Sequence, residues 1–296
     1  MRVIKLPIDH VGIVGSDLDR MLESFSKLGF YLSGRTEMTA GVEGQGASTN
    51  AHFVFDQGYI ETIASTGSDH LADYLARGEG LHIAALRSGD ARKSREELEQ
   101  RGLKPGAVLS AARPARHGSV QGQASFDWFG FDPSSFPEGL VCVVEHKTPE
   151  LIFQPETRYV HPNGAKGIVD LFVYTAGEEG AAPYESLAAG VPAMPLAAGH
   201  TPEWTEQLTL LVSPSEVRDR FPFLGEVSEP RFLGVLIEVA SLQVVKDLLD
   251  EAAVAYHGDG GGDGDRDRDG RRDGRRTIWV HPNDAAGCMV GFTERL

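Results

Sequence analysis

The first strongly patterned stretch of the chain is residues 8–14, IDHVGIV, an apolar, β-rich run interrupted by one histidine, His10. Apolar residues then recur at spacings of three and four, which predicts an amphipathic helix with one apolar face: Leu18, Met21, Leu22, Phe25 and Leu28. The residues Ser16-x-x-Asp19 suit the start of this helix as a cap. Gly29 suits its end, because glycine readily adopts the left-handed conformation that closes a helix.

Three strands are expected after this helix. Two β-rich runs at 50–56 and 58–64 are separated by a tight turn at Gln57 and Gly58, and a less regular strand is expected near 31–37. The first unit of the chain therefore has the order strand, helix and three strands.

The same order of elements returns at 80–86 (GLHIAAL), a strand that carries His82. A charged helix at 90–101 follows, with Ser88 or Asp90 as its cap. Strands near 105–111, 123–130 and 139–146 complete the second unit. The chain thus repeats one β-α-β-β-β module, with a histidine in the first strand of each copy.

The second half of the chain has the pattern of two weaker copies of this module. One would be built from a strand at 167–175, a helix at 183–189 and a strand at 208–212, and the other from a strand at 232–240, a helix at 241–256 and strands at 277–282 and 286–294. We therefore expect an α+β fold of paired βαβββ modules in two domains, 1–158 and 165–296. Residues 257–276 contain no apolar residue apart from glycine, so a disordered loop is expected there.

Composition narrows the class of protein. With 41% hydrophobic and 24% charged residues, the 296-residue chain has the composition of a soluble globular protein. Cys142 and Cys288 lie in strand-like runs, so no disulfide framework is expected and a reducing cytoplasm is the expected location. A net charge of -15 argues against binding to nucleic acid or anionic membranes. The expected partner is a small-molecule substrate, and the chain could form a homodimer.

Each of the first two modules also ends on a strand with an acidic residue among apolar neighbours, Glu61 or Glu145. A buried carboxylate is costly unless it is paired or bound to a cation. Paired histidines and glutamates at matching places therefore predict a site for one divalent metal ion, with His10, Glu61, His82 and Glu145 as ligands. His146 points to the other face of its strand, and a slip of one residue in register would exchange it with Glu145.

The segments IDHVGIVGSDLDRMLESFSKLGF, STNAHFVFDQGYIETI and VVEHKTPELIFQPETRYVHPNGA resemble the vicinal oxygen chelate superfamily, and within it the glyoxalase-like group. The resemblance covers about residues 6–165 and implies a curled cup with a metal ion at its centre. It assigns the ligand positions to the same two histidines and two glutamates, and the metal could be Mn, Ni, Co, Zn, Fe or Mg. It does not specify the substrate.

These residues and the resemblance favour a metal-dependent isomerase, epimerase or lyase. The ion would polarise a small carbonyl compound, and Glu145 or Glu61 would act as general base on the way to an enediolate-type intermediate. Substrate contacts are expected from Asn50, His52, Trp128 and His146, although each of these residues also has a purely structural interpretation. Arg113 is expected in a loop, either reaching over the cup toward an anionic group or simply solvated.

Two other classes of function stay open. One is a binding or drug-sequestering protein of the same fold, and the other is an Fe(II)-dependent dioxygenase that uses the N-terminal cup. Four modules also resemble the extradiol dioxygenases, whose iron lies in the second pair of modules. Here Asp170 stands where that pattern has a histidine, and Gly291 stands where it has a glutamate. The second domain is therefore expected to be metal-free.

Overall fold

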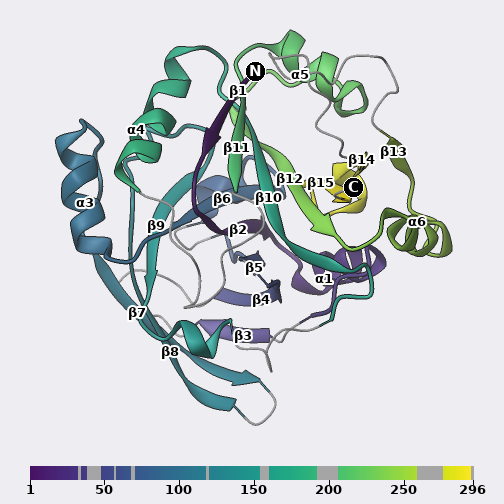
Figure 1. Cartoon of the computed structure of the whole chain (residues 1–296), viewed down its shortest axis with the longest axis horizontal. Helices are drawn as coiled ribbons and strands as arrows, with labels where there is room; N and C mark the ends of the chain where they lie inside the picture. The colour runs from purple at the N-terminus through teal and green to yellow at the C-terminus, as the bar shows by residue number, and fades with distance from the viewer. Residues whose placement is uncertain are drawn as a thin grey trace.

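The structure, a computed structural model, describes residues 1–32, 35–38, 48–56, 58–67, 71–117, 120–153, 160–191, 206–258 and 276–294. Its strands form an eight-stranded and a seven-stranded sheet (Figure 1). No helix within the described ranges has the length and apolar character needed to cross a membrane. Most of the loop predicted at 257–276 lies outside the described residues.

The eight-stranded sheet contains the first two modules. The first module consists of β2 (Ile8–Gly15), α1 (Leu18–Lys27), β3 (Arg35–Met38), β4 (Ser48–Val54) and β5 (Tyr59–Ala64). The second consists of β6 (Gly80–Arg87), α3 (Ala91–Gln100), β7 (Leu109–His117), β8 (Val120–Gly130) and β9 (Leu140–His146), with α2 (Ala72–Leu75) preceding it and the 3-10 helix η1 (Pro149–Leu151) following it. The strand order β3-β4-β5-β2-β6-β9-β8-β7 is symmetric about the antiparallel pair β2 and β6. The predicted duplication is confirmed.

Two β-bulges interrupt this central pair. The register shifts at Asp9 on β2 and at His82 on β6, and each is the extra residue of its bulge. His10 stays in register, opposite Ala85. The two histidines at matching positions of the sequence repeat therefore differ in the sheet, since His82 is the extra residue of a bulge and His10 is paired in register.

The seven-stranded sheet contains most of the second half of the chain. Its elements are β10 (Ala165–Tyr174), α4 (Ala182–Gly190), β11 (Gln207–Leu211), α5 (Pro214–Arg220), β12 (Arg231–Val239), α6 (Leu242–Glu251), β13 (Tyr256–Gly258), β14 (Arg276–Val280) and β15 (Met289–Glu294), with 3-10 helices η3 (Glu179–Ala181), η4 (Pro222–Leu224) and η5 (Pro282–Asp284). The strand order is β1-β11-β10-β12-β15-β14-β13. The N-terminal strand β1 (Arg2–Lys5) pairs antiparallel with β11, just as β4 pairs with β5 in the other sheet. This pairing was not predicted, and the division at 158 and 165 stays a prediction.

The helix ends follow local rules of capping. Asp17, rather than the predicted Ser16, caps α1 by accepting a hydrogen bond from the Arg20 backbone N–H. Asp90 caps α3 in the same way, through the backbone N–H of Lys93. Gly29 has a positive φ of 79°, as predicted for the residue that ends α1.

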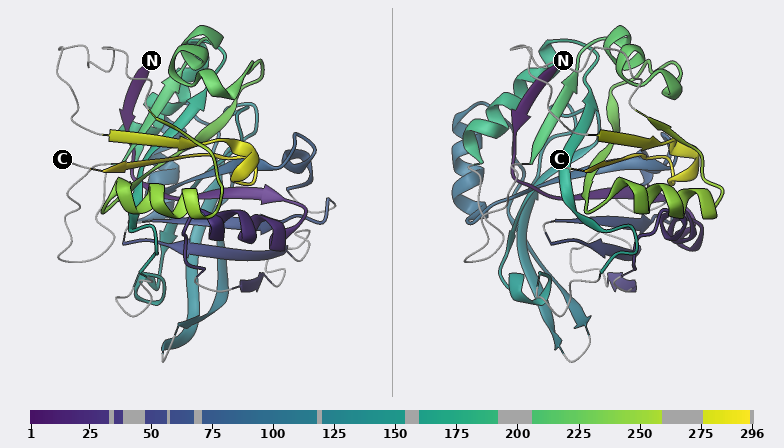
Figure 2. Two further views of the ribbon diagram at one scale, coloured as in Figure 1. Left: turned by 90° about the vertical axis from the view of Figure 1, so that its right-hand side faces the viewer. Right: turned by 45° about the vertical axis from the view of Figure 1, so that its right-hand side comes forward.

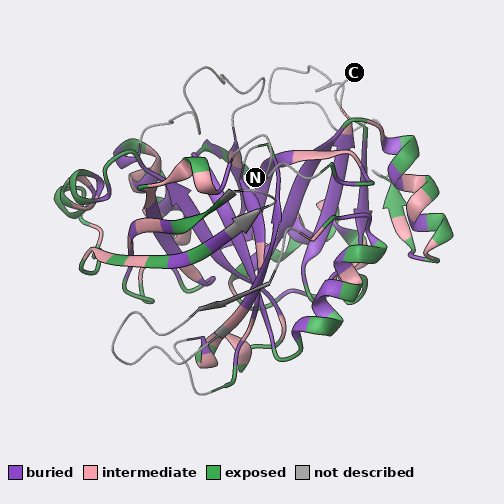
Figure 3. Cartoon of the chain, turned by 90° about the horizontal axis from the view of Figure 1, so that it is seen from below, coloured by how far each residue is buried: buried purple, intermediate pink, exposed green. Residues whose placement is uncertain are grey.

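One apolar core joins the two halves of the molecule. It combines β2 residues such as Val11 and Ile13 with β10 residues such as Leu171 and Val173, together with the apolar faces of the helices. Helices α3 and α4 lie on one side of the molecule and α1 and α6 on the other (Figure 1). Buried residues follow the strands of both sheets (Figure 3), and the β7–β8 hairpin extends away from the rest of the molecule (Figure 2).

The face of the second sheet that lies away from this core is filled by a separate apolar cluster, which includes Phe172, Phe221, Trp279 and Met289. Trp279 lies against Gly291, where an added Cβ would be 2.3 Å from Trp279 Cζ3. The position that would carry a glutamate in a dioxygenase-like site therefore has no room for one. Asp170 accepts hydrogen bonds from Gln207 Nε2 at 2.6 Å and Thr209 Oγ1 at 2.8 Å, so its carboxylate is used within the sheet.

A buried carboxyl group also lies between the two halves. Glu138, which is 1% exposed, accepts a hydrogen bond from Tyr184 Oη of α4 at 3.1 Å, and burial raises the pKa of Glu138. A raised pKa in the folded state means that the folded protein binds the proton more tightly than the unfolded chain does. The resulting stability is present below the unfolded-state pKa and is lost as pH rises through the folded-state pKa.

We therefore expect Glu138→Gln to gain stability relative to the wild type as pH rises from 5 to 8, by at most about 1.4 kcal/mol per pH unit. Urea unfolding at several pH values measures this difference. Glu97→Gln, on the exposed face of α3, is the control and should show no such trend. A constant difference between Glu138→Gln and wild type across the range would contradict the expectation.

Candidate functional site

The first sheet curls so that the strands at its two ends, β3 and β7, contact each other. Its inner face carries two apolar clusters. One contains Val14, Ile63, Leu71, Ile83, Ala85, Cys142 and Val144, with Phe126 and Trp128 packed against it, and we call it the β9 cluster. The other contains Val54, Tyr59, Ala115, Ala124, Ile152 and Phe153, and we call it the β7 cluster.

A group of polar side chains lies between these clusters, and we call it the polar layer: Asp9, His10, Asn50, His52, Glu61, Arg113 and His146. Along β5, Tyr59 belongs to the β7 cluster and Ile63 to the β9 cluster, and Glu61 lies between them. Five of the seven residues are at most 9% exposed. Buried polar groups need partners or a ligand, so a layer of this kind inside an apolar sheet marks a candidate binding or catalytic site.

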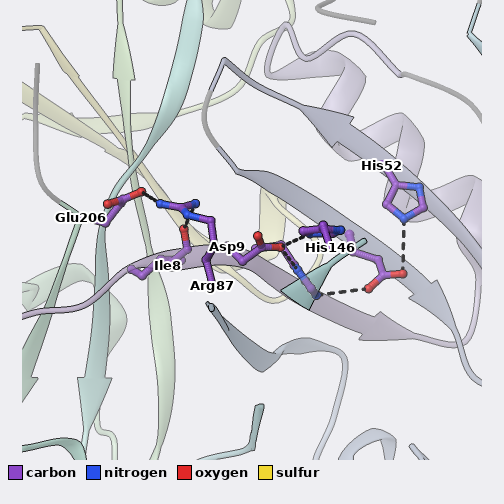
Figure 4. A network of polar contacts seen from close by, with 8 residues as sticks. Ile8, Asp9, His52, Arg87, His146 and Glu206 are labelled. Carbon is purple, nitrogen blue, oxygen red and sulfur yellow. Dashed lines mark hydrogen bonds and ion pairs between the residues drawn. The ribbon is translucent and has the colours of Figure 1, made fainter. Parts of the chain in front are cut away.

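Asp9 connects two imidazole rings in this layer (Figure 4). His10 Nδ1 and His146 Nε2 lie 2.8 and 3.0 Å from Asp9 Oδ1. Burial by itself would raise the pKa of Asp9, but the charge of His146 and the hydrogen bonds from both histidines hold the pKa well below its usual value. An ionised carboxylate only accepts hydrogen bonds, so both of these nitrogens carry a proton.

The hydrogen bond to Asp9 also determines which nitrogen of His10 is left as a hydrogen-bond acceptor. In the neutral ring, protonation of Nδ1 leaves Nε2 as the hydrogen-bond acceptor, and Nε2 lies 3.9 Å from Glu61 Oε2. Tyr59 stacks on the His10 ring, with centroids 4.3 Å apart and planes 14° apart. The ring is therefore fixed in both orientation and tautomer.

The other carboxylate oxygen of Glu61, Oε1, contacts two further side chains of the polar layer. Asn50 Nδ2 donates a hydrogen bond to Glu61 Oε1 at 2.6 Å, and His52 Nε2 lies 3.4 Å from the same atom. Burial would raise the pKa of Glu61, but the hydrogen bond from His52 and the charges of His52, His10 and Arg113 lower it to about 2. Glu61 is therefore an ionised carboxylate at neutral pH, with Oε2 directed toward His10.

Arg113 lies in β7 rather than in the loop that was predicted for it. Ala115, two residues further along the strand, belongs to the β7 cluster, so strand alternation places Arg113 on the same inner face. Burial, followed by the charge of Arg113, lowers the pKa of His52 to about 4. His52 is therefore neutral at pH 7, and Arg113 contributes a positive charge to the polar layer.

Of the four predicted ligands, His10 and Glu61 are brought together, whereas His82 and Glu145 are not. His82 Nε2 lies 2.7 Å from the carbonyl oxygen of Gly78, and its ring is 6.0 Å from that of Tyr74. Glu145 accepts a hydrogen bond from the Ala91 backbone N–H at 2.9 Å, at the start of α3. On β9 it is the next residue, His146, that joins the polar layer.

The contact at α3 predicts a structural role for Glu145. Glu145→Ala should lower the free energy of unfolding by about 1 kcal/mol, because the first turn of α3 loses an acceptor for its backbone N–H and a favourable negative charge. Thermal or urea unfolding measures this, with the exposed Glu150→Ala as the control. Equal stability of the Glu145→Ala variant and the wild type would count against the assignment.

Among the predicted substrate contacts, Asn50, His52 and His146 lie in the polar layer, and Trp128 packs against the β9 cluster beside it. One member of the polar layer, Asp9, was not predicted, although an acid directly before His10 in an apolar run is a signal in the sequence. Arg113 was expected in a loop, either over the cup or solvated, and it lies in β7 instead.

The metal site predicted from the sequence does not fit these positions. His82 Nε2 contacts the Gly78 carbonyl and Glu145 Oε2 accepts from the Ala91 backbone N–H, so two of the four expected ligands are grouped in the layer and two are not. Across the described residues, no group of three or more His, Cys, Asp or Glu side chains is arranged to hold a metal ion.

A buried ion pair extends from the polar layer to the second sheet (Figure 4). Arg87 at the end of β6 donates hydrogen bonds to the Ile8 carbonyl at 3.2 Å and to Glu206 Oε1 at 2.8 Å. Glu206 directly precedes β11, so this pair links the second sheet to the residue before Asp9.

Comparison with known proteins adds the following. The family model described as "Glyoxalase-like domain" matches residues 8–188. A search of curated proteins found no match. Among solved structures, a hypothetical protein from Staphylococcus aureus is 10% identical, with 97% of this chain and 98% of that chain covered and a TM-score of 0.59. A Mn(II)-bound glyoxalase from Novosphingobium aromaticivorans is 12% identical, with 100% and 84% covered and a TM-score of 0.54.

A third solved structure is a xylose isomerase-like TIM barrel/4-hydroxyphenylpyruvate dioxygenase fusion protein. It is 12% identical, with 99% of this chain and 49% of that chain covered and a TM-score of 0.50. At these identities the three structures support the fold alone.

Proposed function

Since the chain belongs to the glyoxalase-like domain family of the vicinal oxygen chelate superfamily, we propose that it is an enzyme that transfers a proton on a small carbonyl compound, with His10 as general base. The observation that carries this proposal is the hydrogen bond from His10 Nδ1 to the fully buried Asp9. A histidine oriented by a carboxylate in this way presents a basic Nε2 to a reacting group.

The remaining residues of the polar layer would supply orientation and charge. His10 Nε2 and Glu61 Oε2 are 3.9 Å apart, so a substrate that enters the layer meets a base and a carboxylate side by side. His10 would remove a proton from the carbon next to the carbonyl group and later return it, and Glu61 would accept a hydrogen bond from the hydroxyl group of a substrate that carries one, such as glycolaldehyde. Arg113 would offset the negative charge that develops on the carbonyl oxygen.

The finer expectation from the sequence, a metal-dependent lyase or isomerase, stays a prediction. A Mn(II)-bound glyoxalase has a similar fold, so a divalent ion is plausible for a protein of this fold. However, the predicted four-residue set does not converge, so no step proposed here is routed through a metal ion.

Exchange of substrate protons with solvent tests the proposal. The full-length chain is incubated in D₂O with pyruvate, 2-oxobutyrate, phenylpyruvate and glycolaldehyde, with EDTA or with added Mn(II), and loss of the proton next to the carbonyl group is followed by NMR. We expect accelerated exchange for at least one compound in the presence of EDTA.

Other results of the exchange assay would support one of the other functions predicted from the sequence. A compound that binds without accelerated exchange would overturn the proposal in favour of the binding protein. Exchange that needs added Mn(II) would overturn the metal-free assignment of His10 and support the metal-dependent expectation. Consumption of oxygen with iron would support the dioxygenase.

A further inference from the structure

The buried cation of the polar layer identifies the class of compound that the site accepts. Arg113 is 8% exposed, and its guanidinium forms no hydrogen bond or ion pair with any of the residues that the structure describes. A buried charge without such partners is costly, and a folded protein normally avoids this cost by pairing the charge. The side chain is held there by a strand, not by a mobile loop.

The residues next to Arg113 in β7 and β8 determine what surrounds its guanidinium. Pro114 follows it, and a proline is tolerated because β7 is the edge strand of its sheet. Ala115 and, opposite Arg113, Ala124 are small members of the β7 cluster. Neither of these two positions therefore covers the guanidinium with a large apolar side chain.

The two carboxylates in the polar layer limit the negative charge that a ligand bound to Arg113 can carry. Asp9 and Glu61 already place two negative charges in the layer against the single charge of Arg113. A dianionic phosphate would add repulsion from both carboxylates, whereas one carboxylate matches the planar guanidinium with two parallel hydrogen bonds.

We propose that Arg113 is the anchor for a substrate carboxylate, so that the compound accepted by the polar layer is a small 2-oxo or related carbonyl acid. This inference rests on the proposed function for the reaction, but it concerns binding alone. The carboxylate is held at Arg113 while the carbon next to the carbonyl group is presented to His10.

Paired ligands that differ only in charge provide the test. Binding of pyruvate, 2-oxobutyrate and phenylpyruvate is compared by calorimetry with binding of their neutral amides. We expect the acid of at least one pair to bind about 10- to 100-fold more tightly than its amide, the range expected for a hydrogen bond to a charged group. Arg113→Gln should remove this preference, and Arg113→Lys should retain part of it. Arg92→Gln, an exposed arginine on α3, should leave it unchanged.

The stability of the ligand-free variants separates anchoring from a structural role. If Arg113 serves a ligand, Arg113→Gln should lose little stability without ligand, because the guanidinium makes no hydrogen bond or ion pair with the described residues and acts on Glu61 only through its charge. A destabilised Arg113→Gln variant that keeps the preference for acids would overturn the proposal. Equal binding of acids and amides, or tighter binding of inorganic phosphate than of any acid, would also overturn it. Because binding is measured without turnover, a wild type that prefers the acids but does not accelerate proton exchange would count against the proton-transfer proposal alone.

Discussion

Replacing His10 by asparagine should lower the rate of solvent proton exchange by a factor of about 10² to 10⁴, the usual contribution of a positioned general base. The measurement is the NMR exchange assay on whichever carbonyl compound the wild type processes. His82→Asn is the matched control, because His82 lies on the neighbouring central strand and its imidazole contacts Gly78 rather than the polar layer. Its exchange rate should equal that of the wild type.

Asp9 is a positioning residue in this account, and its substitution gives a second readout. Asp9→Asn keeps an oxygen that can accept from His10 and His146 but removes its negative charge, so the hydrogen bond that fixes the tautomer of His10 becomes weaker. We expect slower exchange and a change in the tautomer of His10, seen by ¹⁵N NMR of the imidazole. Full activity of His10→Asn, or equal losses in His10→Asn and His82→Asn, would exclude the proposed base.

The fold was predictable because its signals are local. The helix α1 is identified by its apolar spacing and α3 by its charged run and a cap at Ser88 or Asp90, and the repeat of strand, helix and three strands implies two matching halves of one sheet. The pairing of β1 with β11 was not predictable in this way, since no short-range pattern in residues 2–5 indicates a partner more than 200 residues away.

The site was predictable only in part, and the reason is register. The repeat correctly placed His10 and Glu61 near each other, but it assumed that matching positions in the two modules face the same point. The bulge at His82 breaks that equivalence, and on β9 it is His146 rather than Glu145 that faces inward. A β-bulge depends on the pairing of two strands and leaves no mark in either strand alone.

A large effect on the free energy of unfolding is also expected from the ion pair that joins the two sheets. Arg87 and Glu206 are 6% and 3% exposed, and they lie 2.8 Å apart. Burial raises the pKa of Glu206 despite the neighbouring Arg87. Since removing both charges from water offsets much of their attraction, we expect the pair as a whole to add little net stability, although loss of either partner alone is costly.

The two partners should consequently respond differently to substitution. Glu206→Met leaves Arg87 buried without this carboxylate, and because an arginine cannot lose its proton we expect a loss of about 3–5 kcal/mol in the free energy of unfolding. Arg87→Met should cost less near pH 5 than at pH 8, because Glu206 can take up a proton in the folded state. The double variant Arg87→Met/Glu206→Met should recover much of the loss. Urea unfolding at both pH values measures all three, and a double variant less stable than either single one would show that the pair stabilises the fold outright.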